Sequence, residues 1–391
     1  MLGARRNVVC SSPRFWALLL SSCCLVRLLD AQGGSPQPAA QLIPDLASCQ
    51  RCQIIVRERA LTIGADSGLA EIPSSIGWDA RGRVYFTQPK RGTPIVYEPD
   101  SRRMVTLGRA GSGPGEFRMA AVVEIIPGDT VIIFDRGNAR LTVLGPSYRF
   151  ARSAPAPFGT QAMRWWPGPS ALVVNALVRD RERVGRPFHL FDRVGNELRS
   201  LGEGGNVLFG DVGASLMRAM TVDRSGNLVA VTALGRYEVE VWSADGRLVR
   251  RFRREPKDFK YPPAPTSNPT RSSDLPPPDP WISAAWVDST GLLWTAAVVP
   301  DKTWRAGVKL DKVGHGTEVG WQIDVVDPTR YADTIIEVLD LKSGRLVART
   351  RLDQPCRSFS PAGALACEAA NDDGTFRVDV FPVAIAGQLS R

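Results

Sequence analysis

Short apolar stretches separated by turn residues run through most of the chain, and residues 107–144 show this pattern most fully. Three apolar runs rich in β-branched residues occupy 120–126, 130–134 and 140–144, and clusters of Gly, Pro, Asp and Asn separate them. Runs of this length and spacing predict antiparallel strands joined by tight turns. The stretch therefore predicts one β-meander, and similar units can be laid out before and after it.

A loop and a strand end within this unit carry a resemblance to a known family. The loop is Gly113-Pro114-Gly115-Glu116-Phe117, followed by Asp135, Asn138, Arg140, Leu141 and Val143. This combination resembles the repeat of NHL-type six-bladed β-propellers. The sequence matches the repeat closely over this blade, whereas elsewhere only the general pattern of strands and turns agrees. The resemblance implies a propeller architecture and a habit of binding partners, but propellers also host lyases, lactonases and scaffolds, so it does not fix the function.

The rest of the chain can be divided into blades of the same kind. Four-stranded units are expected at 76–107, 120–152, 163–201, 220–254 and 284–351, and a three-stranded one at 357–382. The apolar stretch 54–63 has no hairpin partner near it, and pairing it with 376–382 would close the ring and cover two sheet edges. We therefore predict an all-β fold, a six-bladed β-propeller over 49–384 in which an N-terminal strand completes the last blade.

A recurrent turn between the first two strands of a blade supports this division. It has a side-chain acceptor at its first position and Gly at its fourth, which fits a type I turn whose last residue needs positive φ. The turns begin at Asp79, Asp223, Asp288 and Ser360. Turn chemistry is therefore the preferred explanation of these carboxylates, ahead of catalysis.

Spacing between turns reveals two insertions. Between corresponding turn glycines the fifth blade, from Gly291 to Gly344, is about 33 residues longer than the fourth, which places an insertion at 300–333. A Pro-rich excursion at 255–280 lies between the fourth and fifth blades. The 300–333 insertion lies between the second and third strands of a blade, and the 255–280 insertion lies in the link between two blades. In a four-stranded antiparallel meander these two kinds of connection fall at the same end of the blade. One face is therefore expected to carry both insertions and any binding site.

The N-terminus has the features of a secretory signal. Arg5 and Arg6 precede an apolar run that is too short and too interrupted to span a membrane, so residues 1–31 are predicted to be a signal peptide of an exported protein. Residues 32–48, rich in Pro, Gln, Ala and Ser, are predicted to be a flexible tether. A lipobox-like sequence at Cys23 gives a lipoprotein as the alternative. The location is therefore periplasmic or extracellular, with or without a membrane anchor.

Cysteine parity favours cleavage after residue 31, because this leaves an even set of four cysteines. Cys356 and Cys367 are equally distant from a predicted turn and should face each other across a hairpin, within disulfide reach. Cys49 and Cys52 either pair with each other or form a redox or metal pair. Because no second CxxC is present, a structural disulfide is favoured.

The formal net charge of +9 comes mostly from scattered arginines. Their densest group, 247–254, falls on a predicted outer strand, where charge discourages edge-to-edge pairing. An exported chain without a motif that combines basic and aromatic residues lacks the signature of a nucleic-acid-binding protein. We expect a monomer with no nucleic-acid partner, which meets a membrane only through the alternative anchor at Cys23.

Histidine is scarce, since His189 and His315 are the only two. A three-histidine zinc site is therefore excluded, and the sequence departs here from propeller lyases that rely on several histidines. His189 lies in a strand pattern and is interpreted as structural, whereas His315, in the fifth-blade insertion, is the better site candidate. A Ca²⁺ site of lactonase type would need oxygens from separate blades, for which Asn175, Asp135 and Asp301 are candidates.

Tryptophans gather on the face expected to carry the insertions. Trp304 and Trp321 lie in the 300–333 insertion, and Trp281 ends the Pro-rich one. Exposed indoles anchor partners or stack on sugars, but they equally pin long loops to a disc. Three arginines of a further loop at this face complete the candidate ligand-binding set: Arg179, Arg181 and Arg183.

These observations favour a binding function over catalysis. We expect an exported module that recognises a protein or carbohydrate partner through the insertion-bearing face and needs no cofactor. The alternative is a metal-dependent lyase or lactone hydrolase that holds Ca²⁺ or another divalent cation in the propeller channel, as other members of this superfold do.

Overall fold

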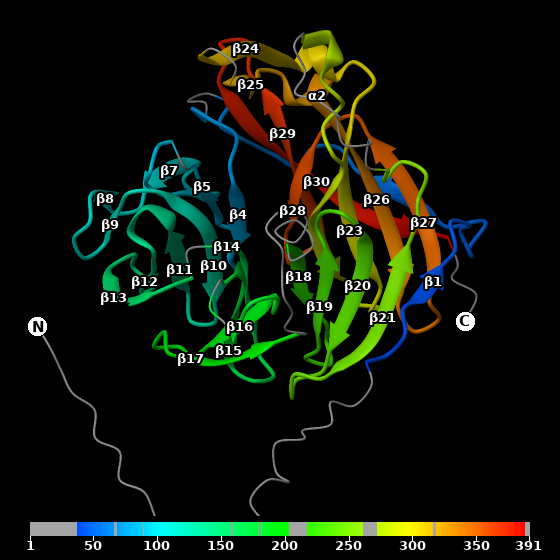
Figure 1. The fold of residues 1–391 in the computed structure, drawn as a ribbon, viewed down its shortest axis with the longest axis horizontal. Coiled ribbons are helices and arrows are strands. Elements are labelled where there is room, and N and C mark those ends of the chain that lie inside the picture. The colour runs from blue at the N-terminus through cyan, green and yellow to red at the C-terminus, as the bar shows by residue number, and fades with distance from the viewer. Residues whose placement is uncertain are drawn as a thin grey trace, which may run out of the picture. The chain divides into compact units, whose positions relative to one another are not determined.

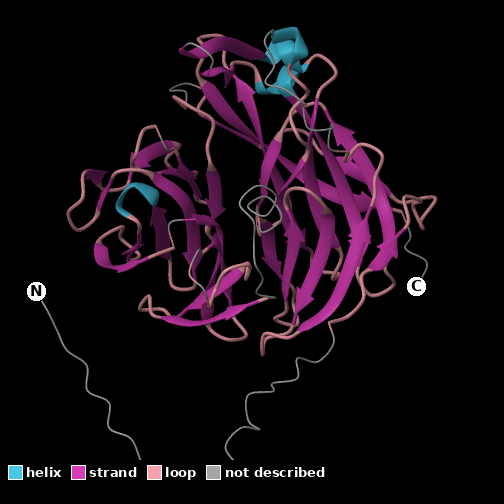
Figure 2. Ribbon diagram, viewed as in Figure 1, coloured by secondary structure: helices cyan, strands magenta, loops and turns pink. Residues whose placement is uncertain are grey.

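The computed structural model describes residues 37–387 apart from 66–68, 89, 158, 179, 181, 203–216, 261–271 and 316–317. The predicted signal peptide with Cys23, and the candidates Arg179 and Arg181, lie outside the described residues. Strands make up most of the described chain (Figure 2). None of the helices in this part of the chain is long and apolar enough to cross a membrane.

Six antiparallel meanders form the described fold (Figure 1). The first blade consists of β4 (Ser75–Trp78), β5 (Val84–Thr87), β6 (Ile95–Glu98) and β7 (Arg103–Thr106). The second contains β10 (Ala120–Ile126), β11 (Thr130–Asp135), β12 (Arg140–Leu144) and β13 (Phe150–Pro155). The third contains β14 (Gly159–Trp166), β15 (Ala171–Leu177), β16 (Phe188–Phe191) and β17 (Glu197–Leu201).

The other three blades follow the same order with one interruption. The fourth contains β18 (Arg218–Val222), β19 (Leu228–Thr232), β20 (Tyr237–Trp242) and β21 (Leu248–Arg254). The fifth contains β22 (Trp281–Val287), β23 (Leu293–Pro300), β26 (Ala332–Asp340) and β27 (Arg345–Leu352). The sixth has β28 (Cys356–Phe359), β29 (Ala364–Ala370) and β30 (Phe376–Ala386). The strand pair inserted in the fifth blade is a separate two-stranded sheet.

Apolar side chains are buried between each blade and the next, which closes the ring. The six core clusters of buried residues each join two neighbouring blades. One of them packs Val84 and Phe86 of the first blade against Val378 and Val380 of the last. The first strands of the blades, β4, β10, β14, β18, β22 and β28, contact each other in order around the centre. The predicted all-β, six-bladed propeller is thus confirmed.

The N-terminal strand completes the last blade, as predicted. β2 (Gln53–Val56) and β3 (Leu61–Ile63) both pair antiparallel with β30, with Val56 opposite Val383 and Leu61 opposite Val380. Without these two strands β30 would be a long unpaired edge. Closure by chain ends from opposite termini therefore covers the edge that the three-stranded sixth blade leaves open.

The segment predicted to be a tether contains a further strand. β1 (Gln41–Ile43) pairs parallel with β21 and adds a fifth strand to the fourth blade. Ser48 then donates its backbone N–H and its hydroxyl to the Leu346 carbonyl of the fifth blade. Over residues 41–48 the predicted flexible tether is therefore corrected: this part of the chain is bonded to the outer edges of two blades. The apolar residue that the prediction passed over is Ile43, which is buried in the core.

The two insertions emerge at the same end of the propeller. The 300–333 insertion contains η3 (Trp304–Gly307), β24 (Val308–His315), β25 (Glu318–Val325) and α2 (Pro328–Tyr331), and the Pro-rich one contains η2 (Ser272–Asp274). The Arg305 guanidinium joins them by donating to the carbonyls of Ser273 at 2.9 Å and Leu275 at 2.5 Å. The prediction of a single insertion-bearing face is therefore confirmed.

The sequence motif of the second blade holds the glycine loop that links the first and second blades. β8 (Arg109–Ala110) and β9 (Glu116–Phe117) flank the glycine loop, and η1 (Arg136–Asn138) precedes β12. Asp135 accepts the backbone N–H groups of Arg118 and Met119 and the amide of Asn138. Arg140 donates to three carbonyls of the loop, those of residues 112, 113 and 116. These residues hold the inter-blade link in place.

The predicted turns and disulfides are present. The turn glycines Gly82, Gly226, Gly291 and Gly363 have φ between 77° and 88°, and Asp79 accepts the backbone N–H groups of Arg81 and Arg83. Disulfides join Cys49 to Cys52 and Cys356 to Cys367. The second bridges directly opposed strand positions, as the spacing predicted.

Candidate functional site

A cavity of about 760 Å³ occupies the centre of the ring. Its walls come from the first strand of every blade, so all six blades contribute to it. The volume lies in the range of small-molecule sites in proteins. We call this cavity the channel, and we call its end nearest the two insertions the mouth.

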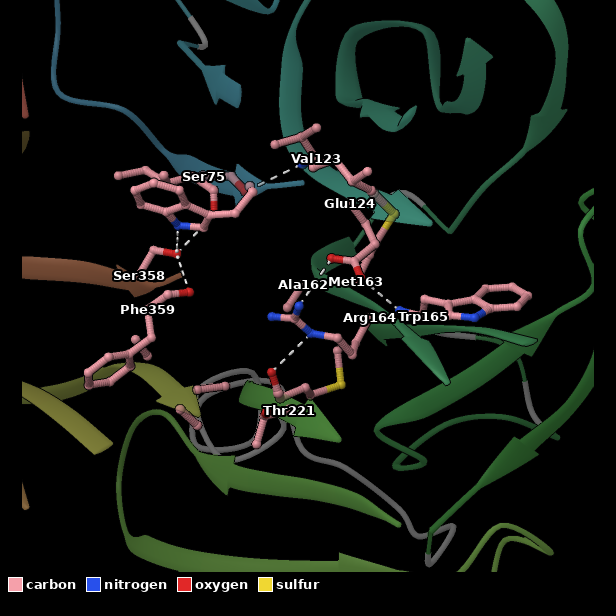
Figure 3. A pocket seen from close by; sticks show the side chains of 18 of the residues that line it. Ser75, Val123, Glu124, Ala162, Met163, Arg164, Trp165, Thr221, Ser358 and Phe359 are labelled. Carbon is pink, nitrogen blue, oxygen red and sulfur yellow. Dashed lines mark hydrogen bonds and ion pairs between the residues drawn. The ribbon is translucent and has the colours of Figure 1, made fainter. Parts of the chain in front are cut away.

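One arginine reaches into the middle of the channel. Arg164 on β14 donates its Nε–H to the Met220 carbonyl of β18 at 3.2 Å, and its Nη1 lies 3.6 Å from a carboxylate oxygen of Glu124 on β10. Figure 3 shows its guanidinium in the open space between Glu124 and the strand that carries Thr221. Three neighbouring blades therefore position this cation.

Glu124 is placed differently from its partner. Its other carboxylate oxygen accepts the backbone N–H of Trp165 at 2.9 Å, and the residue is almost fully buried. Burial raises the pKa of the Glu124 carboxyl, while the Arg164 cation and the Trp165 N–H act in the opposite direction. The carboxylate is thus withdrawn into the wall, whereas the arginine beside it faces the cavity.

The mouth combines an indole with a second arginine. Trp281 begins β22, and the guanidinium of Arg357 on β28 lies 4.9 Å from the centre of its ring. Arg357 is also paired with the buried carboxylate of Glu368. Burial raises the pKa of the Tyr331 hydroxyl in α2, and the charge of Arg357 opposes that rise. The 300–333 insertion therefore reaches the edge of the mouth.

Aromatic and hydroxyl groups line the side of the channel between the sixth and first blades. The Trp78 indole donates to the Ser358 hydroxyl at 3.0 Å, and the hydroxyl donates to the Ile76 carbonyl at 3.2 Å. Phe359 stacks on Trp286, with 5.9 Å between the ring centres. Figure 3 shows Ser358 and Phe359 across the cavity from Arg164. The channel thus offers an apolar and hydroxyl-bearing wall opposite a cation.

Ion pairs lie at the end of the channel away from the insertions. Asp79 is bound by the Arg83 guanidinium, and Asp129 lies 2.9 Å from Arg81. Both carboxylates belong to turns or lie next to them, and each is neutralised by an arginine close in sequence or space. Neither offers a free negative charge to a ligand.

Trp281 and Trp304, two of the predicted contact residues, have different positions. Trp281 lines the mouth, as expected of a contact residue. Trp304 is only 4% exposed and packs beside the guanidinium of Arg305. Its burial favours the anchoring role that the sequence left open over a direct ligand contact. The sequence could not decide between these two roles, because both require an indole at this face.

The hairpin of β24 and β25 carries the remaining predicted residues of the insertion. Trp321 is partly exposed and pairs with Lys312 across the hairpin. His315 pairs with Glu318 near the hairpin turn, and its side chain lies outside the described residues. Trp321 does not line the channel. The hairpin and the mouth are therefore two separate candidate contact surfaces at the same face.

Arg183 is not available as a free cation. Its guanidinium binds the carboxylates of both Asp180 and Glu197. His189, interpreted as structural, is fully buried in the third blade with its Nδ1 2.8 Å from the Ser200 hydroxyl. Burial lowers the pKa of this imidazole. Both residues stabilise the blade that carries them.

The candidate ligands for a channel cation do not come together. Asp135 holds the glycine loop of the second blade, Asn175 joins the Pro187 carbonyl to the Arg218 N–H, and Asp301 accepts from Thr303 in its own loop. Among the described residues no group of three or more His, Cys, Asp or Glu side chains could hold a metal ion. These residues therefore do not fit the divalent cation of the lyase or lactonase alternative.

Sequence reasoning missed Arg164, Glu124 and Arg357. Each is a charged residue within the first strand of a blade. A charge at such a position points either into a paired core or into the channel, so the position itself was a usable signal. Which of the two applies depends on the twist of each blade and could not be predicted.

Known proteins share the fold of this chain. No family model matches it, and no curated protein does. A member of the DUF4221 family from Bacteroides vulgatus has a TM-score of 0.58 at 11% identity, covering 86% of this chain and 99% of that one. A putative exported protein from Bacteroides fragilis has a TM-score of 0.53 at 12% identity, covering 89% and 99%. At these identities the similarities show the propeller fold alone.

Proposed function

We propose that this protein is an exported binding module that takes a carbohydrate partner at its insertion-bearing face, in the mouth of the channel. The observation that carries the proposal is the pairing of Trp281 with Arg357 above a cavity of small-molecule size. An indole offers a flat apolar surface for a sugar ring, and an arginine supplies hydrogen-bond donors beside it.

Export is supported by three observations. The N-terminal sequence has the charge and apolar pattern of a secretory signal. Two disulfides join the cysteines that remain after its removal, and such bonds persist in oxidising compartments. One protein of the same fold is itself named as an exported protein.

The dimensions of the site favour a carbohydrate over a protein partner. A cavity of about 760 Å³ admits a few sugar units and excludes the face of a folded domain. A protein partner would instead contact the hairpin of β24 and β25, where Ile323 is exposed. The resemblance of the second blade to NHL-type propellers supports a binding role in either case.

An oligosaccharide-array screen with the full chain tests the proposal, using Trp281→Ala and the matched control Trp321→Ala. Wild type and the control should bind the same sugars, and Trp281→Ala should lose at least about tenfold in affinity, as expected for a central aromatic contact. Binding that depends on Trp321 and not on Trp281 would move the site to the hairpin. An array without a single Trp281-dependent sugar would contradict the carbohydrate assignment.

A further inference from the structure

In the ion pairs that line the channel, the arginine side chains are more exposed to the cavity than their acidic partners. The side chain of Arg164 is 42% exposed, whereas that of its partner Glu124 is 9% exposed. Arg357 at the mouth is likewise more exposed than Glu368, which is buried. Although each arginine has an acidic neighbour, a molecule inside the channel meets guanidinium groups first. The surface that a ligand contacts is therefore cationic even though the pairs are formally neutral.

Arg164 also retains hydrogen-bonding capacity. A guanidinium has five N–H donors. With described residues, the Arg164 guanidinium makes one hydrogen bond, to the Met220 carbonyl, and one ion pair, at 3.6 Å from Glu124. That ion-pair distance is longer than a charge-assisted hydrogen bond, which is about 2.7–2.9 Å. Donors of this side chain therefore remain directed into the open cavity shown in Figure 3.

No other carboxylate described in the channel wall carries a free negative charge that would repel a bound anion. The carboxylates at the far end, Asp79 and Asp129, are bound by Arg83 and Arg81. The Glu124 carboxylate is withdrawn into the wall, where it accepts the backbone N–H of Trp165. The opposite wall supplies the Trp78 indole, the Ser358 hydroxyl and Phe359. A ligand that suits this space has an apolar, hydroxyl-bearing body and one negative group.

We propose that the channel contains an anion site centred on Arg164, so that the sugar it takes is an acidic one whose oxyanion binds the Arg164 guanidinium. This inference rests on the proposed function and adds the substrate class to it. The planar fork of arginine matches a carboxylate in two parallel hydrogen bonds and also fits a phosphate. A uronic acid carboxylate and a sugar phosphate therefore share the required chemistry.

Three probes that share one ring test the inference: glucuronate, glucose 6-phosphate and glucose. Binding to the full chain is followed by ligand-observed NMR. Both anions should bind at least about tenfold tighter than glucose, the gain expected from a charge-assisted hydrogen bond. The tighter of the two anions identifies the carboxylate or the phosphate as the natural group. Raising the salt concentration should reduce the difference in affinity between the two anions and glucose.

Four variants assign the effect to the channel. Arg164→Met should bring the affinity for the two anions to that for glucose, and Arg164→Lys should keep part of the preference. Glu124→Gln removes the neighbouring charge and should strengthen anion binding, which a purely structural pair would not do. Arg247→Met is the control, because Arg247 pairs with Asp245 on an exposed turn outside the channel. The anion preference should be unchanged in this control.

The outcomes separate this inference from the proposed function. If the three sugars bind equally and Arg164→Met changes nothing, the anion site is overturned while carbohydrate binding stands. If inorganic phosphate binds in an Arg164-dependent manner but no sugar binds, the anion site stands and the carbohydrate assignment fails. If neither sugars nor phosphate bind, both fall. Should Arg164→Met fail to fold, the result for Glu124→Gln decides alone: unchanged or weaker anion binding overturns the site.

Discussion

Among the described residues, two arginine–glutamate pairs join strands of different blades, and they differ in what surrounds the guanidinium. Arg254 is fully buried and donates to both carboxylate oxygens of Glu337, to Asp45 and to the carbonyls of residues 43 and 44. Arg164 donates to one carbonyl and lies beside one carboxylate. The first guanidinium uses every N–H it has, and the second does not.

The difference shows how to tell a structural arginine from a ligand-binding one. Desolvating a guanidinium is costly unless each of its donors is paired. Arg254 meets that condition by fastening the N-terminal segment and the fourth blade to the fifth. Arg164 avoids the cost by facing a cavity, where solvent or a ligand can reach it. Both pairs join an arginine to a glutamate. They are distinguished by how many of the guanidinium N–H groups are hydrogen-bonded.

The largest effect is expected from breaking the saturated pair. Arg254→Met removes the closer cation from the buried carboxylate of Glu337 and leaves the more distant guanidinium of Arg349, 3.8 Å away. We expect a loss of about 3–5 kcal/mol in the free energy of unfolding. Chemical denaturation followed by tryptophan fluorescence measures it. Arg254→Met combined with Glu337→Leu should recover part of the loss, because no unpaired charge is left. A loss below about 1 kcal/mol in the single variant would show that the pair is not a structural one.

A smaller effect on stability is expected at the channel pair. Arg164→Met removes a half-exposed side chain with one hydrogen bond, and the loss should be about 1–2 kcal/mol. The same denaturation experiment compares the two arginines directly. Arg247→Met, on an exposed turn, should stay within about 0.5 kcal/mol of wild type. Equal losses at Arg164 and Arg254 would break the distinction drawn between them.

The smallest effect concerns the pH dependence of stability. Burial holds the pKa of Glu124 above its ordinary value of 4.5, so the folded state binds this proton more tightly than the unfolded state. The contribution to stability is therefore full below pH 4.5 and is lost as the pH rises through the pKa of the folded state. Glutamine does not titrate, so the Glu124→Gln variant lacks this pH-dependent contribution to stability. Unfolding midpoints measured across this range should fall with pH in wild type relative to the variant.

Subtracting the two curves isolates Glu124. Glu368 and Asp333, whose pKa values are also raised by burial, are present in both proteins and cancel in the difference. Parallel curves between pH 4.5 and neutrality would contradict the position assigned to Glu124 in the channel wall.

The fold was more predictable from the sequence than the site. The turn that begins at Asp79 and the hairpin that joins Cys356 to Cys367 are local, and their spacing alone set the register. Closure by β3 followed from a missing strand at the other end of the chain. β1 was missed because a three-residue strand in a Pro-rich segment has too few apolar positions to show a period.

The channel residues depend on geometry that no local pattern encodes. Arg164, Met220 and Glu124 belong to three blades and meet only when the ring is closed. At Trp304 the residue type and position allowed either a ligand contact or an anchor for the insertion, and only the structure shows that the side chain is buried. A pattern predicts where a strand lies, whereas the neighbours of its side chains are decided by the packing of blades far apart in sequence.

A crystal structure of the protein soaked with glucuronate would show where an acidic sugar binds. We predict that the sugar lies in the channel with its carboxylate within hydrogen-bond distance of the Arg164 guanidinium and that Arg164→Met crystals show no sugar there. A sugar bound instead at the β24–β25 hairpin, or one that stays in the channel unchanged without Arg164, would contradict this prediction.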